Sequence, residues 1–367
     1  MQVMSNTGRV YNFGAGPAML PESVLAHAQD ALINWNNTGI SILEIGHRTE
    51  EVACLLHQAE TTLRYLLGIP SNYHVLFLGG AARTHFAMIP MNFIGKNQEA
   101  GYVISGIWSR MAYQEASKLR PAYCIASSEA QQFVSVPEQS EFILNNNTAY
   151  LYYTPNETIN GLRLSLPKIK TIPLVADMTS CLLSEPINIK DYDLIFAGAQ
   201  KNIANAGLTL VIVKQDFLDT VDSSLIPSML DYRLQAKYHS LYATPPVFNC
   251  YIAAQMFDWI KNQGGVDVLY ERNCRKAAAL YQYIDSTEFY STSVDPAARS
   301  IMNVCFHLKH AHLEDNFLQQ AKDHGLVALK GHRLVGGLRA SLYNAMPMSG
   351  VEALIHFMKK FAKEHEK

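Results

Sequence analysis

Lys201 is the residue of this chain best suited to covalent chemistry, because it stands between two apolar segments, 194–197 and 208–213. A lysine normally extends its ammonium group to water. One that is kept from water has a lowered pKa, and its neutral amine can attack an aldehyde to form a Schiff base. The alternative is a lysine at the edge of a loop that pairs with a nearby carboxylate.

A carboxylate and an aromatic ring follow other apolar segments of the chain. Asp177 ends the segment 174–176, and Trp108 comes after a strand expected over 102–105. Pyridoxal phosphate needs a lysine, a carboxylate for its ring nitrogen, a stacking surface and donors for its phosphate. Asp177 alone would be interpreted as a structural cap. With Lys201 one strand later, it becomes a candidate partner of the ring nitrogen.

The run Gly79-Gly-Ala-Ala-Arg-Thr84 lies between an apolar strand expected over 74–78 and a helix. Free backbone N–H groups and the helix dipole make such a junction an anion site. The same residues could form a tight strand-to-helix turn without a ligand. Together with the lysine and the aspartate, however, the run supplies the donors that a cofactor phosphate requires.

Several basic residues could bind an anionic substrate, and they are His47, Arg48, Arg83, His332, Arg333 and Arg339. Arginine binds a carboxylate or a phosphate in a bidentate manner. Isolated arginines more often form surface ion pairs, but segment 330–340 is rich in glycine and contains two arginines six residues apart. His307, His310 and His312 have no carboxylate at a matching spacing, so we predict no metal site.

Apolar strands alternate with helices through the first two thirds of the chain, which predicts an α/β fold with a mostly parallel sheet. Ligands of such sheets bind beyond the carboxyl ends of the strands. The candidate residues lie at or just after such ends, namely Arg83, Trp108, Thr158, Asp177 and Lys201. Residues Val24, Leu25, Ala28, Leu32 and Trp35 are expected on the buried face of an early helix.

A long helix is expected to end at Gly264 and Gly265, where we place a domain boundary. The remaining chain predicts a helix over 266–284, an alternating strand over 300–308 and two further helices. Strands covered by helices on one side suggest a small α+β domain. The length of 367 residues agrees with two domains.

The composition excludes several classes of protein. Hydrophobic residues make up 49% of the chain, charged residues 17%, and the net charge is −2, which argues against a nucleic-acid-binding protein. The six cysteines form no C-x-x-C pair, so free thiols are expected. No apolar run is long enough for a transmembrane helix, and we recognise no secretory signal, so we expect a cytoplasmic protein.

Longer motifs over nearly the whole chain resemble the phosphoserine aminotransferase family, in the class V group of pyridoxal-phosphate enzymes. They are Gly16-Pro-Ala-Met-Leu-Pro21, Glu44 to Arg48, Pro155 to Ile159, Ala197 to Asn202, Thr244-Pro-Pro246, and Lys330 to Pro347. The last one distinguishes the family from other class V members. The resemblance implies the type I fold of pyridoxal-phosphate enzymes, with a large cofactor-binding domain over 16–264 and a small domain formed by 1–15 and 265–367.

The resemblance also implies roles for individual residues. Lys201 would carry the cofactor as a Schiff base, Asp177 would bind its ring nitrogen, Trp108 would stack on its ring and Thr158 would bond its phenolic oxygen. Its phosphate would be bound by Ala82, Arg83 and Gln200, and by Ala243 and Thr244 from the second subunit of a homodimer. Arg339 would bind the substrate α-carboxylate. The substrate phosphate or the glutamate side chain would contact His47, Arg48, Arg83, and His332 and Arg333 from the partner subunit.

The implied reaction is a ping-pong transamination in serine biosynthesis, in which Lys201 moves the proton. Glutamate would donate its amino group to 3-phosphohydroxypyruvate, giving O-phospho-L-serine and 2-oxoglutarate. The pocket would also convert 3-hydroxy-2-oxo-4-phosphonooxybutanoate to 4-phosphohydroxy-L-threonine, in pyridoxine biosynthesis. One alternative is a class V aminotransferase for unphosphorylated alanine, serine or glyoxylate. The other is a catalytically silent dimer that binds the cofactor or a partner.

Three positions depart from the family pattern. The family usually has asparagine at Ala243, glutamine at His85 and commonly arginine at Glu185. Ala243 removes one neutral donor to the cofactor phosphate, and water can replace such a donor. We therefore expect weaker retention of the cofactor rather than a loss of chemistry.

Overall fold

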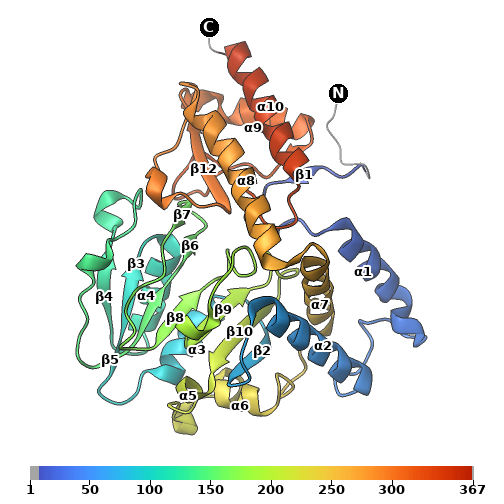
Figure 1. The fold of residues 1–367 in the computed structure, drawn as a ribbon, viewed down its shortest axis with the longest axis vertical. Helices are drawn as coiled ribbons and strands as arrows, with labels where there is room; N and C mark the ends of the chain where they lie inside the picture. The colour runs from blue at the N-terminus through green and yellow to red at the C-terminus, as the bar shows by residue number, and fades with distance from the viewer. Residues whose placement is uncertain (1–7, 366–367) are drawn as a thin grey trace.

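The computed structural model describes residues 8–365. In Figure 1 a large sheet with its helices occupies the lower part of the molecule, and α8, α9, α10 and β12 form the upper part. The strands are β1 (Tyr11–Asn12), β2 (Tyr73–Gly79), β3 (Glu99–Ile104), β4 (Ala122–Ser127), β5 (Thr148–Tyr153), β6 (Asn156–Glu157), β7 (Leu162–Arg163), β8 (Leu174–Asp177), β9 (Leu194–Gly198), β10 (Leu208–Lys214), β11 (Tyr290–Ser291), β12 (Asn303–Leu308), β13 (Leu326–Val327) and β14 (Leu338–Ser341).

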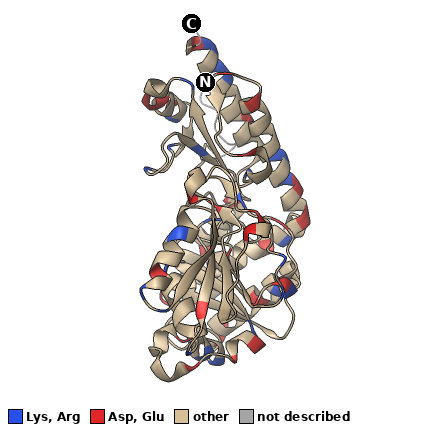
Figure 2. Ribbon diagram, turned by 90° about the vertical axis from the view of Figure 1, so that its left-hand side faces the viewer, with Lys and Arg blue, Asp and Glu red and all other residues tan. Residues whose placement is uncertain are grey.

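The helices cover the large sheet below and the small sheet above. They are α1 (Glu22–Asn34), α2 (Glu50–Leu67), α3 (Thr84–Phe93), α4 (Ile107–Ser117), α5 (Gln215–Leu218), α6 (Tyr232–Lys237), α7 (Val247–Asn262), α8 (Gly265–Asp285), α9 (Glu314–Asp323) and α10 (Met348–His365). No helix within residues 8–365 is both long and apolar enough to cross a membrane. Acidic and basic residues are interspersed along both parts of the chain (Figure 2).

The large sheet has seven strands in the order β2-β10-β9-β8-β5-β3-β4. The five strands from β9 to β4 are mutually parallel, whereas β10 runs antiparallel to both of its neighbours, β2 and β9. This architecture confirms the predicted α/β fold with a mainly parallel mixed sheet. The carboxyl ends of β2, β9, β8, β5 and β3 therefore meet at one edge of the sheet.

The strands of this sheet are buried on both faces, because alternate residues enter two different apolar clusters. In β5, Leu151 and Tyr153 pack in one cluster with residues of α2 and α7. Tyr150 and Tyr152 pack in the other cluster with residues of α3 and α4. Two helical layers thus enclose the sheet and leave its carboxyl edge to carry the polar groups.

A third apolar cluster joins the beginning of the chain to its end. It contains Tyr11 and Phe13 together with side chains of α8, α9, α10 and the three-stranded sheet β11-β12-β14. Strand β1 pairs in parallel with β13. Gly264 and Gly265 both have positive φ angles between α7 and α8. The division into domains at 15/16 and 264/265 stays a prediction.

Two details differ from the sequence-based expectations. On α1 the structure buries Val24, Ala28 and Ala31, whereas Leu25 and Leu32 are 37% and 39% exposed, so the predicted apolar face was wrong at those two positions. Strand β4 was not predicted. Its apolar pattern is weak because it lies at the edge of the sheet, where several of its side chains are only partly buried.

Candidate active site

A cavity of about 180 Å³ lies at the carboxyl edge of the large sheet. Its lining residues come from the segments that follow β2, β3, β5, β8 and β9, and they are Ala81, Ala82, Arg83, Phe86, Trp108, Thr154, Asn156, Thr158, Asp177, Thr179, Ser180, Gln200 and Lys201. Seven of the predicted cofactor residues are in this group. The structure therefore brings together Ala82, Arg83, Trp108, Thr158, Asp177, Gln200 and Lys201 from distant parts of the chain.

Lys201 is buried in the short loop between β9 and β10. Its Nζ donates hydrogen bonds to Thr158 Oγ1 and, at 2.7 Å, to Ser180 Oγ. Burial lowers the pKa of Lys201 to about 8, against the opposing effect of the Asp177 charge. About a tenth of the amine is consequently neutral at pH 7, far more than for an exposed lysine, and the neutral form is the one a nucleophile requires.

Asp177 is the last residue of β8 and is 5% exposed. Its Oδ1 accepts a hydrogen bond from the backbone N–H of Thr179 at 3.0 Å. Burial raises the pKa of Asp177, while the bonds from Thr179 and the charge of Lys201 oppose that shift. A carboxylate in these surroundings gains from a cationic partner, such as the protonated nitrogen of a pyridine ring.

Trp108 lies in the first turn of α4 and lines the cavity. Its backbone N–H donates to Glu157 Oε2 at 2.9 Å, and the guanidinium of Arg83 lies 4.8 Å from the centre of its ring. The indole Nε1 is buried and has no hydrogen-bond partner in the described structure. Trp108 thus presents a flat apolar surface and an unused donor beside the cavity.

The turn after β2 leads into the N-terminus of α3, as its sequence predicted. Within residues 8–365 the structure shows no hydrogen bond from the backbone N–H groups of Ala81, Ala82 and Arg83. Gly198 is required on the other side, because a Cβ atom there would lie 2.7 Å from Gln200 Oε1 and 3.1 Å from Ala82 Cβ. The free amides and the helix dipole form an anion site.

These features test whether the residues fit pyridoxal phosphate. The site offers a buried amine and a buried carboxylate, the unused indole Nε1 of Trp108, and free amides at a helix N-terminus. Thr154 Oγ1 is also buried without a partner. These groups match the aldehyde, ring nitrogen, ring and phosphate of the cofactor, so the residues present fit it.

The predicted substrate residues divide into two groups. Arg83 lines the cavity, and Arg339 on β14 reaches it, because its Nη1 lies 3.4 Å from the carbonyl oxygen of Thr158, to which it donates. The Arg339 Nε is buried and has no partner in the described structure. His332 lies in the loop before β14, and its pKa is lowered by partial burial and by the charges of Arg339, Arg333 and Arg83. His332 therefore lies near the arginines of its own chain.

The other group does not line this cavity within the single chain. It contains His47 and Arg48, in the turn before α2, and Arg333. The predicted cofactor residues Ala243 and Thr244, before α7, do not line the cavity either. His47 Nε2 is buried without a hydrogen-bond partner in the part of the chain described. The roles assigned to these five residues stay predictions, as do those of the residues that line the cavity.

All three departures from the family pattern, Ala243 included, lie outside the cavity lining. His85 is 2% exposed and its Nδ1 shares a hydrogen bond with the hydroxyl of Tyr232. Burial lowers the pKa of His85 to about 3, so its ring is neutral. Glu185 forms an ion pair with Arg163. Both side chains are thus part of the supporting structure.

Two residues next to the chemistry were missed by the sequence analysis. Ser180 accepts a hydrogen bond from Lys201, and Glu157 binds the backbone of Trp108. Glu157 belongs to the motif Pro155 to Ile159, which carried the family resemblance, but the sequence assigned no role to this residue. Ser180 lies in an irregular turn three residues after Asp177, where no sequence periodicity indicates the direction of a side chain.

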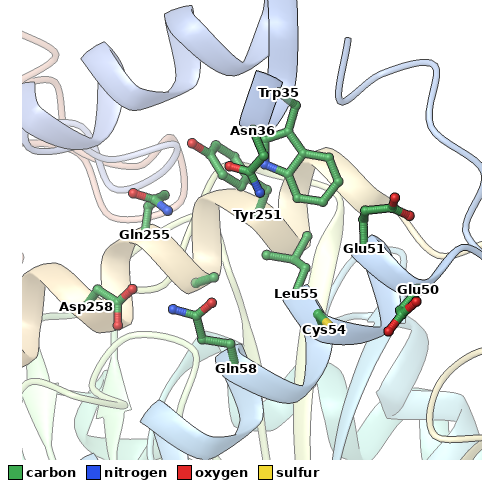
Figure 3. A pocket seen from close by; sticks show the side chains of 11 residues that line it. Trp35, Asn36, Glu50, Glu51, Cys54, Leu55, Gln58, Tyr251, Gln255 and Asp258 are labelled. Atoms are coloured by element: carbon green, nitrogen blue, oxygen red, sulfur yellow. The ribbon is translucent and has the colours of Figure 1, made fainter. Parts of the chain in front are cut away.

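A larger hollow of about 540 Å³ lies between α2 and α7 and has a different character. Figure 3 shows Glu50, Glu51 and Asp258 around it, together with Trp35 and Tyr251. No lysine or arginine lines it, so it does not suit a phosphorylated ligand. Among the described residues, no group of three or more histidine, cysteine or acidic side chains is placed to hold a metal ion.

Comparison with known proteins agrees with this site. A model of the family "Aminotransferase class-V" matches residues 10–354. Phosphoserine aminotransferases from Legionella pneumophila and Coxiella burnetii are 64% and 47% identical to the chain, over 97% of it and 99% of the relative in each case. The solved phosphoserine aminotransferase of Bacillus circulans subsp. alkalophilus is 43% identical, with a TM-score of 0.94 over 97% of this chain and 99% of that one.

A solved structure described as PLP-bound, the phosphoserine aminotransferase of Trichomonas vaginalis, is 37% identical with a TM-score of 0.92 and covers 96% of this chain and 100% of that chain. An alanine–glyoxylate aminotransferase from Nostoc sp. has a TM-score of 0.79 at 16% identity, over 98% of this chain and 97% of that one, which shows the fold alone. The family match and the high identity over almost the full length lead to one conclusion: the chain belongs to the phosphoserine aminotransferase family of class V aminotransferases.

Proposed function

We propose that this chain transfers the amino group of glutamate to 3-phosphohydroxypyruvate, giving O-phospho-L-serine and 2-oxoglutarate. The observation that carries the proposal is the buried Lys201 amine, which lies among Thr158, Ser180 and Asp177 in a cavity that Arg83 lines. When bound there, pyridoxal phosphate supplies an electron sink for the bond between the substrate Cα and its hydrogen.

Proton transfer, cofactor binding and substrate binding are carried out by different residues of the chain. Lys201 Nζ removes the Cα proton of the amino acid and later returns a proton, acting as general base and acid. Thr158 and Ser180 hold that amine in place while it is not reacting. The Asp177 carboxylate would keep the ring nitrogen of the bound cofactor protonated, and the Trp108 indole would provide the surface on which its ring stacks. Arg339 binds the α-carboxylate of the substrate.

A comparison of substrates tests the proposal. Purified protein should be yellow, and Lys201→Ala should lose both the visible absorbance and all turnover with glutamate and 3-phosphohydroxypyruvate. Turnover by the variant would contradict the proposal. Comparable rates with 3-phosphohydroxypyruvate and with pyruvate would instead favour a class V aminotransferase for unphosphorylated substrates, because the guanidinium groups would then contribute nothing to selection.

We propose in addition that the chain accepts the one-carbon-longer substrate, 3-hydroxy-2-oxo-4-phosphonooxybutanoate, and so acts in pyridoxine biosynthesis as well. Support comes from Arg83 and Arg339, because both substrates carry the phosphate and the carboxylate that guanidinium groups bind in a bidentate manner. Steady-state kinetics with both phosphorylated oxo acids measures this second activity. The pyridoxine role is excluded if only 3-phosphohydroxypyruvate is converted. A cytoplasmic location stays a prediction.

We also propose a homodimer that completes the site. His47, Arg48, Ala243 and Thr244 do not line the cavity of their own chain. Next to the first pair, α1 and the segment after it expose apolar side chains, of which Ile33 is 80% and Leu43 is 64% exposed. A second copy that covers this surface would bury them.

The mass in solution and the effect of one charge test the dimer. Sedimentation should give about twice 41.0 kDa. Ile33→Asp should lower that mass and weaken cofactor retention in parallel. Leu225→Asp is the matched control, because Leu225 is similarly exposed, at 83%, but lies in a different region, before α6. A monomeric protein with full cofactor retention would refute the shared site.

A further inference from the structure

Glu157 is a buried carboxylate beside the cavity, and the reaction described above gives it no role. It is 1% exposed and lies on β6, directly before Thr158. Its Oε2 accepts from the backbone N–H of Trp108 at 2.9 Å, and its Oε1 accepts from that of Ser109 at 2.8 Å. Both oxygens are therefore committed to the first turn of α4.

The start of α4 is shaped around this carboxylate. A Cβ atom on Gly106 would lie 2.4 Å from Glu157 Cδ and 2.7 Å from its Oε2, so only glycine allows the approach. Ser109 Oγ accepts from the backbone N–H of Gly106 and of Ser105, each at 3.0 Å. The free amides of this helix end are thus shared among the Ser109 hydroxyl, the Glu157 carboxylate and Asn160 Oδ1, which accepts from the backbone N–H of Ile107 at 3.3 Å.

No lysine or arginine forms an ion pair with Glu157 within residues 8–365, so the amides and the helix dipole compensate its charge. Burial raises the pKa of Glu157 to about 7, and the hydrogen bonds from Ser109 and Trp108 oppose the shift. Glu157 also interacts electrostatically with three other titratable groups, namely Asp177, Lys201 and Tyr152.

The position of Glu157 links two residues that line the cavity, Trp108 and Thr158. It fixes the backbone of Trp108, and it precedes Thr158, whose hydroxyl accepts from Lys201. We propose that Glu157 is a positioning residue that fixes the Trp108 ring relative to Thr158 and Lys201 and thereby sets how tightly the cofactor is retained. This inference rests on the proposed cofactor chemistry.

Glu157→Gln tests the inference, because glutamine keeps the shape but can accept only one of the two backbone bonds. The holoenzyme of the variant should lose pyridoxal phosphate on dialysis more readily than the parent. Its affinity for the cofactor should be about tenfold weaker, which corresponds to the loss of one hydrogen bond. The KM for glutamate should change less than twofold, because Arg339 is untouched. The near-ultraviolet circular dichroism of the cofactor-free protein should also change, since the Trp108 ring loses its fixed orientation.

The pH dependence separates positioning from a general loss of structure. Protonation of Glu157 replaces one acceptor with a donor, so the parent protein should retain the cofactor less well as the pH falls through about 7. Glu157→Gln should lack this contribution to the pH dependence of cofactor retention. The contribution from the titration of Lys201 should remain in both proteins. Glu129→Gln is the matched control, because Glu129 pairs with Arg110 of the same helix but lies at the surface.

Parent-like cofactor affinity in Glu157→Gln would overturn the inference, and so would a parent-like pH profile or an equal loss in Glu129→Gln. If Glu157→Gln does not fold, Glu157→Asp decides, because its shorter side chain cannot reach both backbone N–H groups, and parent-like cofactor affinity in that variant contradicts the role of Glu157. A parent protein that never binds pyridoxal phosphate would refute the proposed function instead, so the two failures are distinguishable.

Discussion

Removal of the Ser180 hydroxyl should change the pKa of the Lys201 amine in a direction that the structure fixes. Lys201 Nζ donates to Ser180 Oγ at 2.7 Å and to Thr158 Oγ1, and both acceptors are buried. Ser180→Ala takes away one acceptor and leaves Thr158 in place. The hydrogen bond to Ser180 stabilises the ammonium form of Lys201 more than the neutral amine. Its removal should therefore lower the pKa of Lys201.

The size of the shift follows from the strength of that bond. A hydrogen bond to a charged group contributes about 1.5 kcal/mol, and 1.36 kcal/mol corresponds to one pKa unit. Burial already lowers the pKa of Lys201 to about 8. The variant should therefore titrate about one unit lower, near neutrality.

The assay uses cofactor-free protein and follows the covalent binding of added pyridoxal phosphate by its absorbance as a function of pH. The rate should rise with the fraction of neutral amine, and its midpoint reports the pKa of Lys201. Ser184→Ala is the control, because Ser184 Oγ donates to the Cys181 carbonyl in the same loop at 2.7 Å. A midpoint in Ser180→Ala that equals or exceeds the parent value would refute the reasoning.

Three further changes test the supporting structure. Gly106→Ala should lower the free energy of unfolding by about 1–3 kcal/mol in urea titrations, because its Cβ would lie 2.4 Å from Glu157; an unchanged value would show that the helix start can shift. Lys276→Met should cost about 3 kcal/mol in the same measurement, since three carbonyls, those of Leu342, Tyr343 and Met346, lose their donor. Ionisation of Glu157 should lower parent stability by about 3 kcal/mol as the pH rises from 4.5 to about 7, because over that range the carboxyl is ionised only in the unfolded chain. Calorimetry of the parent and Glu157→Gln checks this slope, which the variant should lack.

The sequence allowed the chemistry to be predicted where a strand end marked it. Lys201 and Asp177 follow short apolar runs, and the structure places both at the carboxyl edge of one sheet. Parallel strands that are buried on both faces have a continuous apolar pattern, so their ends are visible in the sequence. The same reasoning located Trp108 and the turn after β2.

Other features depend on contacts that one segment does not encode. The antiparallel direction of β10 follows from a short loop, and β10 has the same apolar pattern as its parallel neighbours. Ser180 and Glu157 act through the direction of single side chains, the first in an irregular turn and the second on the short strand β6. Leu25 and Leu32 have the spacing of a helical apolar face, but the face that the structure buries contains Val24, Ala28 and Ala31. The choice between these two overlapping faces depends on a packing partner elsewhere in the fold.

The antiparallel course of β10 has a mechanical consequence for the amine of Lys201. Its first residue, Leu208, pairs with Gly79 at the end of β2, and Thr209 pairs with Gly198 at the end of β9. The loop 199–207 is closed by a hydrogen bond from Ala199 N–H to the Leu208 carbonyl at 2.9 Å, and a second bond joins Ala204 N–H to the Ala199 carbonyl at 2.7 Å. Both ends of the loop are thus anchored to one sheet edge. The travel of the amine between its partners must come from rotation about side-chain bonds, a fast motion that requires no rearrangement of the backbone.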